Sequence, residues 1–211
     1  MIDLETYIIN LPHRKDRLEE TLRELDGLGI NPELIHAIPA RLTPRNGAIG
    51  CAMSHAFALS SFLFSSDSHA CLVVEDDFEC KAPDVFRDKI PGILRHHDNW
   101  DVVLLAWNGG VGIEQQVFEG IWKVQGTQTA SAYVVNRKYA PSLIRLFYQA
   151  GEMAASHVFK LHRGFQQSFY AIDMLWKNEQ LFNRFLAFNP AVARQRASYS
   201  DIENAVKDYG V

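Results

Sequence analysis

Short apolar runs alternate with helix-period segments through the first half of the chain. The runs are β-branched and four to six residues long, which is the pattern of buried strands. The segments between them repeat apolar residues every three or four positions, as Leu18, Leu22 and Leu25 do. This alternation predicts strands at residues 6–11, 34–38, 72–77 and 101–106, and helices at 16–28, 48–64 and 83–96.

The second half of the chain continues the pattern less regularly. It predicts strands at residues 121–125, 131–136 and 185–188, and helices at 138–150 and 171–182. Strands that alternate with helices favour an α/β fold with a mostly parallel central sheet flanked by helices. A chain of 211 residues fits a single domain, residues 1–211.

Composition and charge narrow the function classes. The chain is 47% hydrophobic and 22% charged, as ordinary folded proteins are, and its net charge of −4 provides no general field to attract nucleic acid. No apolar stretch approaches the ~20 residues that span a bilayer, and the start lacks a basic signal-peptide region. Three cysteines without a CxxC pair indicate neither a disulfide framework nor a thiolate zinc site. We therefore expect a cytoplasmic protein.

Three consecutive acids, Glu75, Asp76 and Asp77, follow the predicted strand LVV. Neighbouring carboxylates repel one another unless a positive group joins them. Because side chains alternate along a strand, Glu75 and Asp77 are expected on one face, where they form part of a site for a hard divalent cation. The alternative is a solvated turn before the helix that begins at Pro83.

Basic residues follow the first predicted strand in the segment INLPHRKDR, residues 9–17. At a strand end and helix start, Arg14 and Arg17 are positioned to hold phosphates. The alternative is a solvated first turn in which acids neutralise these bases. Ligands of α/β sheets lie beyond the carboxyl ends of the strands, so both this segment and the acids occupy favourable positions.

A third candidate segment is GAIGCAMSH, residues 47–55. Ser54 and His55 supply a hydroxyl and an imidazole near a helix start, but the glycine spacing matches neither a dinucleotide fingerprint nor a P-loop. A lone histidine in so apolar a helix is usually a core residue whose hydrogen bonds are satisfied. Both interpretations of His55 stay open at this point.

The order of these three segments resembles that of glycosyltransferase family 25. The segments are the YIINL strand with DR beyond it, the GxxGCxxSH helix and the VVEDD strand end. This group contains bacterial lipooligosaccharide glycosyltransferases and is related to the collagen galactosyltransferases. Further matches are TASAYVVNRKYA at residues 129–140, the acid in AIDMLW at 171–176 and NPAVARQRASYSDI at 189–202. The resemblance spans about residues 6 to 202.

The resemblance implies a GT-A-like nucleotide-sugar fold. Residues 1–110 would bind the nucleotide sugar, and residues 111–211 would form the acceptor half and the C-terminal tail. Glu75 and Asp77 would bind Mn²⁺ (or Mg²⁺), which in turn holds the donor diphosphate. The expected donor-binding residues are Asn10, Arg14, Arg17, Ser54, His55, Glu75, Asp76 and Gln195. His13 stands where family members commonly have arginine.

Asp173 is the candidate general base. The family is expected to invert the anomeric carbon, which requires a base that accepts the proton of the acceptor hydroxyl. Asp173 lies at a predicted helix start in the acceptor half, where its alternative role is that of an N-cap.

The predicted function is transfer of a hexose, galactose or glucose, from a UDP-sugar to lipooligosaccharide, lipopolysaccharide or another surface glycan. An oligosaccharide or lipid-linked glycan would be the acceptor, and peripheral contact with the inner face of the cytoplasmic membrane is a further expectation. Two other functions are compatible with the residues. One is a catalytically silent module that binds a nucleotide sugar or glycan; the other is a metal-dependent phosphohydrolase, although its usual DxDG opening is absent.

Overall fold

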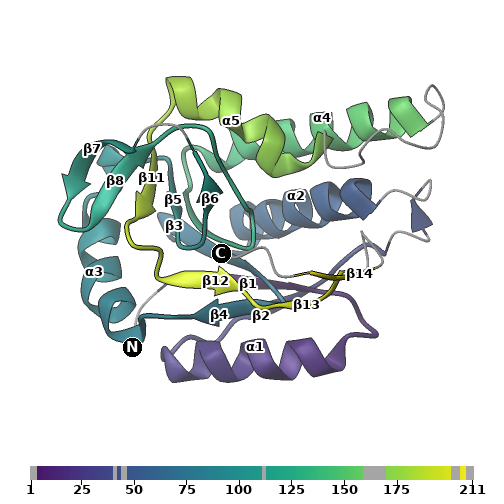
Figure 1. The fold of residues 1–211 in the computed structure, drawn as a ribbon, viewed down its shortest axis with the longest axis horizontal. Helices are drawn as coiled ribbons and strands as arrows, with labels where there is room; N and C mark the ends of the chain where they lie inside the picture. Colours follow the sequence, from purple (N-terminus) through teal and green to yellow (C-terminus); the bar gives the residue numbers. More distant parts are fainter. Residues whose placement is uncertain are drawn as a thin grey trace.

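A computed structural model describes residues 4–39, 42–43, 47–110, 113–158, 170–200 and 205–207. In this part of the chain a central sheet of eight strands is packed between helices (Figure 1). In spatial order the strands are β2 (Glu33–His36), β1 (Glu5–Asn10), β3 (Ala70–Glu75), β10 (Ala132–Asn136), β5 (Val102–Leu104), β11 (Phe185–Phe188), β8 (Ile121–Val124) and β7 (Ile113–Phe118).

The sheet is mixed, so the expectation of a mostly parallel sheet was wrong. β1 lies parallel to β2 and β3, and β5 lies parallel to β11. β10 runs antiparallel to both β3 and β5, and β8 runs antiparallel to both β11 and β7. One strand of the second half, β10, is therefore inserted between β3 and β5 of the first half, and β11, β8 and β7 extend the sheet beyond β5.

Helices cover both faces of the sheet (Figure 1). Side chains of α2, α4 and α5 share one hydrophobic core with alternate residues of the strands, and side chains of α1 and α3 share the other. The helices are α1 (Lys15–Gly27), α2 (Gly47–Ser65), α3 (Pro83–Arg95), α4 (Ala140–Val158) and α5 (Ile172–Phe182), with a short 3-10 helix at His97–Asn99. The alternation of strand residues between the two cores follows from the two-residue period of a strand.

The helix α2 is long and apolar enough to cross a membrane, contrary to the expectation that no stretch approaches that length. Most of it is buried inside the protein, however, between the sheet and α4. A helix that is apolar around most of its circumference is typical of a buried core position. Its composition therefore follows from its place in the fold.

Three short strand pairs lie outside the central sheet. They are β4 (Phe78–Cys80) with β12 (Ala193–Gln195), β6 (Asn108–Gly109) with β9 (Thr127–Gln128), and β13 (Ser198–Ser200) with β14 (Ala205–Lys207). β4 begins directly after the acidic turn, so its antiparallel pairing with β12 brings the C-terminal part of the chain to the carboxyl end of β3.

Candidate nucleotide-sugar site

Arginine is the positive group that joins the adjacent aspartates. β3 ends at Glu75, and Asp76 and Asp77 form a turn, so the strand alternation expected for them does not apply. Asp76 and Asp77 are only 5% and 4% exposed. Nη2 of Arg17, from the first turn of α1, makes ion pairs with Oδ1 of Asp76 and with Oδ2 of Asp77, the latter at 2.5 Å. The solvated-turn alternative is therefore wrong.

Asp77 retains one oxygen without a partner. Its Oδ2 accepts a hydrogen bond from Nε2 of Gln195 at 2.9 Å, whereas its Oδ1 is buried and has no hydrogen-bond partner among the described residues. The Nε of Arg17 is also buried, and no hydrogen-bond partner for it lies in the described part of the chain. Burial and the charge of Glu75 raise the pKa of Asp77 to about 7, despite the opposing effect of Arg17. An additional cation would stabilise this carboxylate.

Asp76, in contrast, uses both of its carboxylate oxygens in contacts within the protein. Its Oδ2 accepts a hydrogen bond from Nδ2 of Asn10 at 2.7 Å, and its backbone oxygen accepts one from Oγ1 of Thr21 at 2.8 Å. Burial raises the pKa of Asp76. With its other oxygen on Arg17, Asp76 ties the end of β1, the helix α1 and the acidic turn together.

Glu75 is held by a chain of hydrogen bonds that begins in the core. Its backbone N–H donates to the oxygen of Ser131 at 2.8 Å, and its Oε1 lies 3.1 Å from Nε2 of His55. The Nδ1 of that imidazole lies 3.0 Å from the hydroxyl of Tyr133. Burial alone would raise the pKa of Glu75, but the hydrogen bond and charge of His55 hold it below its ordinary value.

These contacts show that each of the two interpretations of His55 is correct in part. Its ring is fully buried and both of its nitrogens have partners, as in a satisfied core histidine. One of those partners is the carboxylate of Glu75, whose side chain is 25% exposed. His55 therefore orients an acid of the candidate site rather than facing a ligand directly.

The hydroxyl of Ser54 fixes backbone on both sides. It donates to the oxygen of Gly50 at 2.6 Å and accepts the N–H of Ile38 at 2.9 Å. These bonds attach the segment after β2 to α2. A direct contact between Ser54 and a nucleotide stays a prediction.

Arg14 lies at the N-terminal end of α1. Its backbone oxygen accepts a hydrogen bond from Nδ2 of Asn10 at 2.9 Å, and its guanidinium lies 3.4 Å from the carboxylate of Asp16. The side chain is only 15% exposed. The structure therefore places Arg14, Arg17 and Asn10 together at the carboxyl end of β1, as expected, while phosphate binding stays a prediction.

Asp173 lies in the first turn of α5, but it does not cap that helix. The N-cap residue is Ala171, and Oδ2 of Asp173 instead accepts the backbone N–H of Thr129 at 3.0 Å. Thr129 has a φ of 88°, which is uncommon for a β-branched residue. Burial and the charge of Glu75 raise the pKa of Asp173, so this acid lies within electrostatic range of the acidic turn. Its hydrogen bond supports the strained loop at Thr129, and its role as general base stays a prediction.

Gln195 reaches the site through β12. The register of β12 with β4 places Gln195 opposite Phe78, next to Asp77 along the chain. The hydrogen bond from Gln195 to Asp77 follows from this pairing. Gln195 and Asp77 thus lie together, while a contact of Gln195 with a nucleotide stays a prediction.

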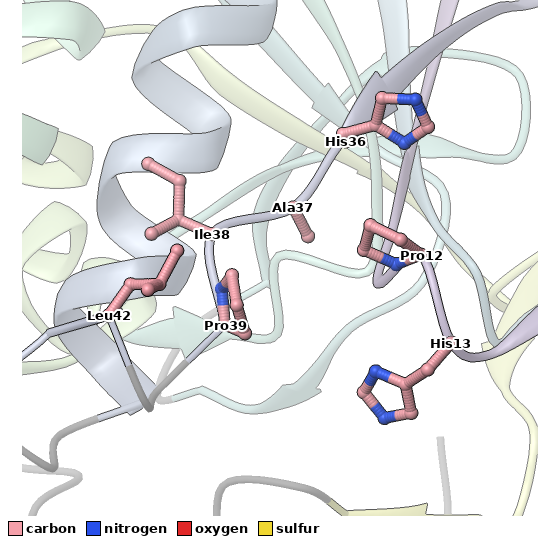
Figure 2. A pocket seen from close by; sticks show the side chains of 7 residues that line it. All are labelled: Pro12, His13, His36, Ala37, Ile38, Pro39 and Leu42. Atoms are coloured by element: carbon pink, nitrogen blue, oxygen red, sulfur yellow. The ribbon is translucent and has the colours of Figure 1, made fainter.

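A pocket of about 500 Å³ lies just beyond the ends of β1 and β2. Figure 2 shows Pro12 and His13, from the segment after β1, together with residues from β2 to Leu42. The remaining lining residues are His36, Ala37, Ile38 and Pro39. Asn10, which contacts Asp76, lies two residues before Pro12 of the pocket lining.

Sequence reasoning missed several residues of the site. Cys51 lies near Glu75, with its Sγ 3.8 Å from Oε1, and Tyr133 orients His55. The spacing of Cys51 and His55, four residues apart in one helix, was a detectable signal because such residues share a helix face. The contribution of Tyr133 depends on the antiparallel position of β10, which the pattern did not indicate.

The described residues fit a divalent cation. Asp77 Oδ1 is a buried acceptor without a partner, and the half-exposed carboxylate of Glu75 lies close enough to raise the pKa of Asp77. Carboxylate oxygens are the ligands that Mg²⁺ and Mn²⁺ prefer. Glu75 and Asp77 are therefore the side chains that would hold the ion.

No protein-family model matches the sequence, and no curated protein matches it either. Solved structures do match in fold. A glycosyltransferase involved in the glycosylation of the major capsid of PBCV-1 is 8% identical, with a TM-score of 0.55, over 95% of this chain and 96% of that chain. The structure of A197 from STIV is 15% identical, with a TM-score of 0.50, over 89% of this chain and 82% of that chain.

At these identities the likeness concerns the fold, and it does not bear on membership of glycosyltransferase family 25. It confirms the expectation of a GT-A-like fold, with the correction that the sheet is mixed. The chain is a single α/β domain with the GT-A-like fold, in which the acidic turn after β3 lies at the carboxyl edge of the sheet.

Proposed function

We propose that this protein is a metal-dependent glycosyltransferase of the family 25 type that uses a UDP-sugar as donor. The observation that carries the proposal is the buried Asp77 oxygen without a partner, beside Glu75, at the end of β3 in a GT-A-like fold. A buried acid with a pKa of about 7 is costly to keep ionised in the absence of a cation. Such perturbed groups cluster at functional sites.

In this proposal the nucleoside occupies the pocket beside Pro12 and His36, and the diphosphate extends toward the acidic turn. The pocket is within the size range of small-molecule sites, and it begins two residues beyond Asn10. Arg14 and Arg17, at the start of α1, follow the pocket residues Pro12 and His13 in the sequence and contribute positive charge. This arrangement matches the rule that ligands bind beyond the carboxyl ends of sheet strands.

The ion held by Glu75 and Asp77, Mn²⁺ or Mg²⁺, would supply Lewis-acid stabilisation of the charge on the departing diphosphate. The protein's own residues do the remaining work. His55 fixes the orientation of Glu75, and Gln195 fixes that of Asp77. Asp173 accepts the proton of the acceptor hydroxyl as the hexose is transferred with inversion, and its raised pKa brings it closer to neutral pH.

The hexose is galactose or glucose, and the acceptor is lipooligosaccharide, lipopolysaccharide or another surface glycan, presented as an oligosaccharide or on a lipid. In this scheme residues 1–110 bind the donor, residues 111–211 build the acceptor side, and the protein works in the cytoplasm at the inner face of the membrane. Support for these finer assignments comes from the sequence resemblance alone.

Release of UDP tests the proposal. UDP-galactose and UDP-glucose are each incubated with the protein, Mn²⁺ and truncated lipooligosaccharide, and UDP is quantified. We expect turnover that Asp77→Ala abolishes, while Asp84→Asn, a change of an acid whose side chain is 96% exposed, retains it. Absence of turnover with either donor, together with absence of a thermal shift with UDP and Mn²⁺, would overturn the proposal.

A catalytically silent binding module is the second candidate, because Arg17 already pairs with both aspartates and His55 already contacts Glu75. Those contacts make the acidic turn stable without an ion. A thermal shift with UDP in the absence of UDP release, with lipooligosaccharide as well as other glycan acceptors, would favour this candidate.

A further inference from the structure

Three side chains with metal-binding chemistry meet beside the acidic turn. Cys51 and His55 lie four residues apart in α2, so they share one face of the helix, and Glu75 approaches from the end of β3. One ligand atom of each, the thiol sulfur, an imidazole nitrogen and a carboxylate oxygen, lies within 4.8 Å of the others.

The separations are close to those of a tetrahedral zinc site. Glu75 Oε1 lies 3.1 Å from Nε2 of His55 and 3.8 Å from Sγ of Cys51. Ligands at ordinary Zn–S, Zn–N and Zn–O lengths are about 3.3–3.5 Å apart when the angles are tetrahedral. Both separations are therefore within about 0.3 Å of that geometry, and the sulfur and the imidazole nitrogen lie within 4.8 Å of each other.

The contact of His55 with Tyr133 prepares the imidazole for this role. Ligating histidines usually donate their second ring N–H to a neighbouring acceptor, which fixes the tautomer and the ring plane. Here Nδ1 lies 3.0 Å from the hydroxyl of Tyr133, so it can carry the proton and donate it to that oxygen. In the metal-free protein Nε2 donates its proton to the contact with Glu75, so when the ion binds, Nε2 gives up that proton and presents its lone pair to the ion.

The surroundings of Cys51 are strongly negative. Burial, Glu75 and Asp173 raise the pKa of the Cys51 thiol well above its ordinary range, so in the metal-free protein it carries its proton. The same negative surroundings favour a divalent cation at this position. Arg17 is committed to the two aspartates.

We propose that Cys51, His55 and Glu75 bind a thiophilic divalent cation such as Zn²⁺, with a water or substrate atom in the fourth position. As the metal–sulfur bond forms, the thiol proton leaves to solvent. Thiolate and imidazole ligands select zinc over the hard ions that carboxylates alone prefer. The site therefore differs in chemistry from the pair Glu75 and Asp77.

The two sites share Glu75, which has a functional consequence that rests on the proposed transferase activity. Zinc at Cys51 and His55 withdraws the Glu75 carboxylate from the ion that binds the donor diphosphate. Micromolar zinc is thus expected to inhibit a reaction that manganese supports.

Binding of Co²⁺ tests the proposed metal site without any measurement of transferase activity. Co²⁺ is titrated into the full-length, metal-free protein, and the near-ultraviolet thiolate-to-cobalt charge-transfer band is recorded. We expect one Co²⁺ per chain, displaced by Zn²⁺, with the band lost in Cys51→Ser. The matched control is Cys80→Ser, another half-buried cysteine, whose Sγ donates a hydrogen bond to the oxygen of Val192 at 3.6 Å. Tyr133→Phe should weaken Co²⁺ binding about 10- to 100-fold.

Thermal melting shows whether each variant is folded, and serine for cysteine is a nearly isosteric change. A band that is absent in the wild type, persists in Cys51→Ser or disappears in Cys80→Ser would overturn the site. Inhibition is then measured as the ratio of UDP release with and without zinc within each variant. A ratio unchanged by Cys51→Ser would refute inhibition through this site. The cobalt spectrum does not depend on transferase activity, so it tests the metal site even if the protein transfers no sugar.

Discussion

Replacement of Asp77 with asparagine should stabilise the metal-free protein at alkaline pH. Asparagine has the shape of a protonated aspartic acid, and its amide oxygen can still accept the hydrogen bond that Gln195 donates. The substitution therefore removes a buried negative charge and leaves most of the packing unchanged.

The size of the effect follows from the pKa of Asp77. It is about 7 in the folded protein and ~3.9 in an unfolded chain, and a difference of about three pKa units corresponds to about 4 kcal/mol. Because the folded value is the higher one, the stability contributed by the bound proton is fully present below about pH 4 and is lost as the pH rises through about 7. We expect Asp77→Asn to match the wild type at pH 4 and to exceed it by about 2–4 kcal/mol at pH 8.

Urea unfolding in the presence of a chelator measures this difference. The fully buried Trp100 and Trp176 provide the fluorescence signal, and Asp84→Asn serves as the exposed-acid control. Saturating Mn²⁺ should then stabilise the wild type by about 2.7 kcal/mol at 100 times its dissociation constant, but not the variant. If Asp77→Asn is no more stable than the wild type at pH 8 without metal, the reasoning about the buried charge is refuted.

Three further substitutions test other parts of the site. Gly50→Ala places a methyl group 2.2 Å from the backbone oxygen of Ile38, so we expect a loss of at least about 3 kcal/mol in urea unfolding, and a wild-type midpoint would contradict the close approach. Asp173→Asn can still accept the Thr129 N–H; kcat should fall about 100-fold or more with an unchanged melting temperature, whereas retained kcat would exclude a general base. Arg17→Gln leaves two buried acids without their ion-pair partner, so the free energy of unfolding at pH 8 should fall by about 3–5 kcal/mol. Saturating Mn²⁺ should make this loss smaller. A loss of the same size with and without Mn²⁺ would argue against a cation among these acids.

The sequence pattern was informative where a signal is local. The predicted strand at 185–188 matches β11, and the predicted helix at 48–64 differs from α2 by one residue at each end. β11 is a run of four consecutive apolar residues, and α2 is a long, almost continuously apolar segment. β4 and β12 were missed because strands of three residues carry too little periodicity.

The direction of each strand in the sheet could not be predicted from the local sequence pattern. The prediction of a mostly parallel sheet assumed that each helix returns the chain to the same edge, which holds for β1, β2 and β3. β10 enters antiparallel between β3 and β5, and this placement depends on packing against both neighbours rather than on the composition of β10 itself.

The candidate site was predicted only in part, because its contacts between distant segments leave no local signal in the sequence. The acids, Asn10 and Gln195 were identified from motifs, and the structure brings them into contact. The ion pairs of Arg17 with Asp76 and Asp77 were not foreseen, because a basic residue sixty positions away gives no sign in the sequence of which charge it will neutralise.

The central position of β10 has a consequence for biosynthesis. Until residues 132–136 have left the ribosome, β3 and β5 lack the strand that joins them, and both would present unpaired backbone edges in an otherwise complete N-terminal portion. A fragment that stops near residue 110 should therefore aggregate instead of folding as an independent nucleotide-binding unit. During translation, the nascent chain would need protection by chaperones until its second half is made.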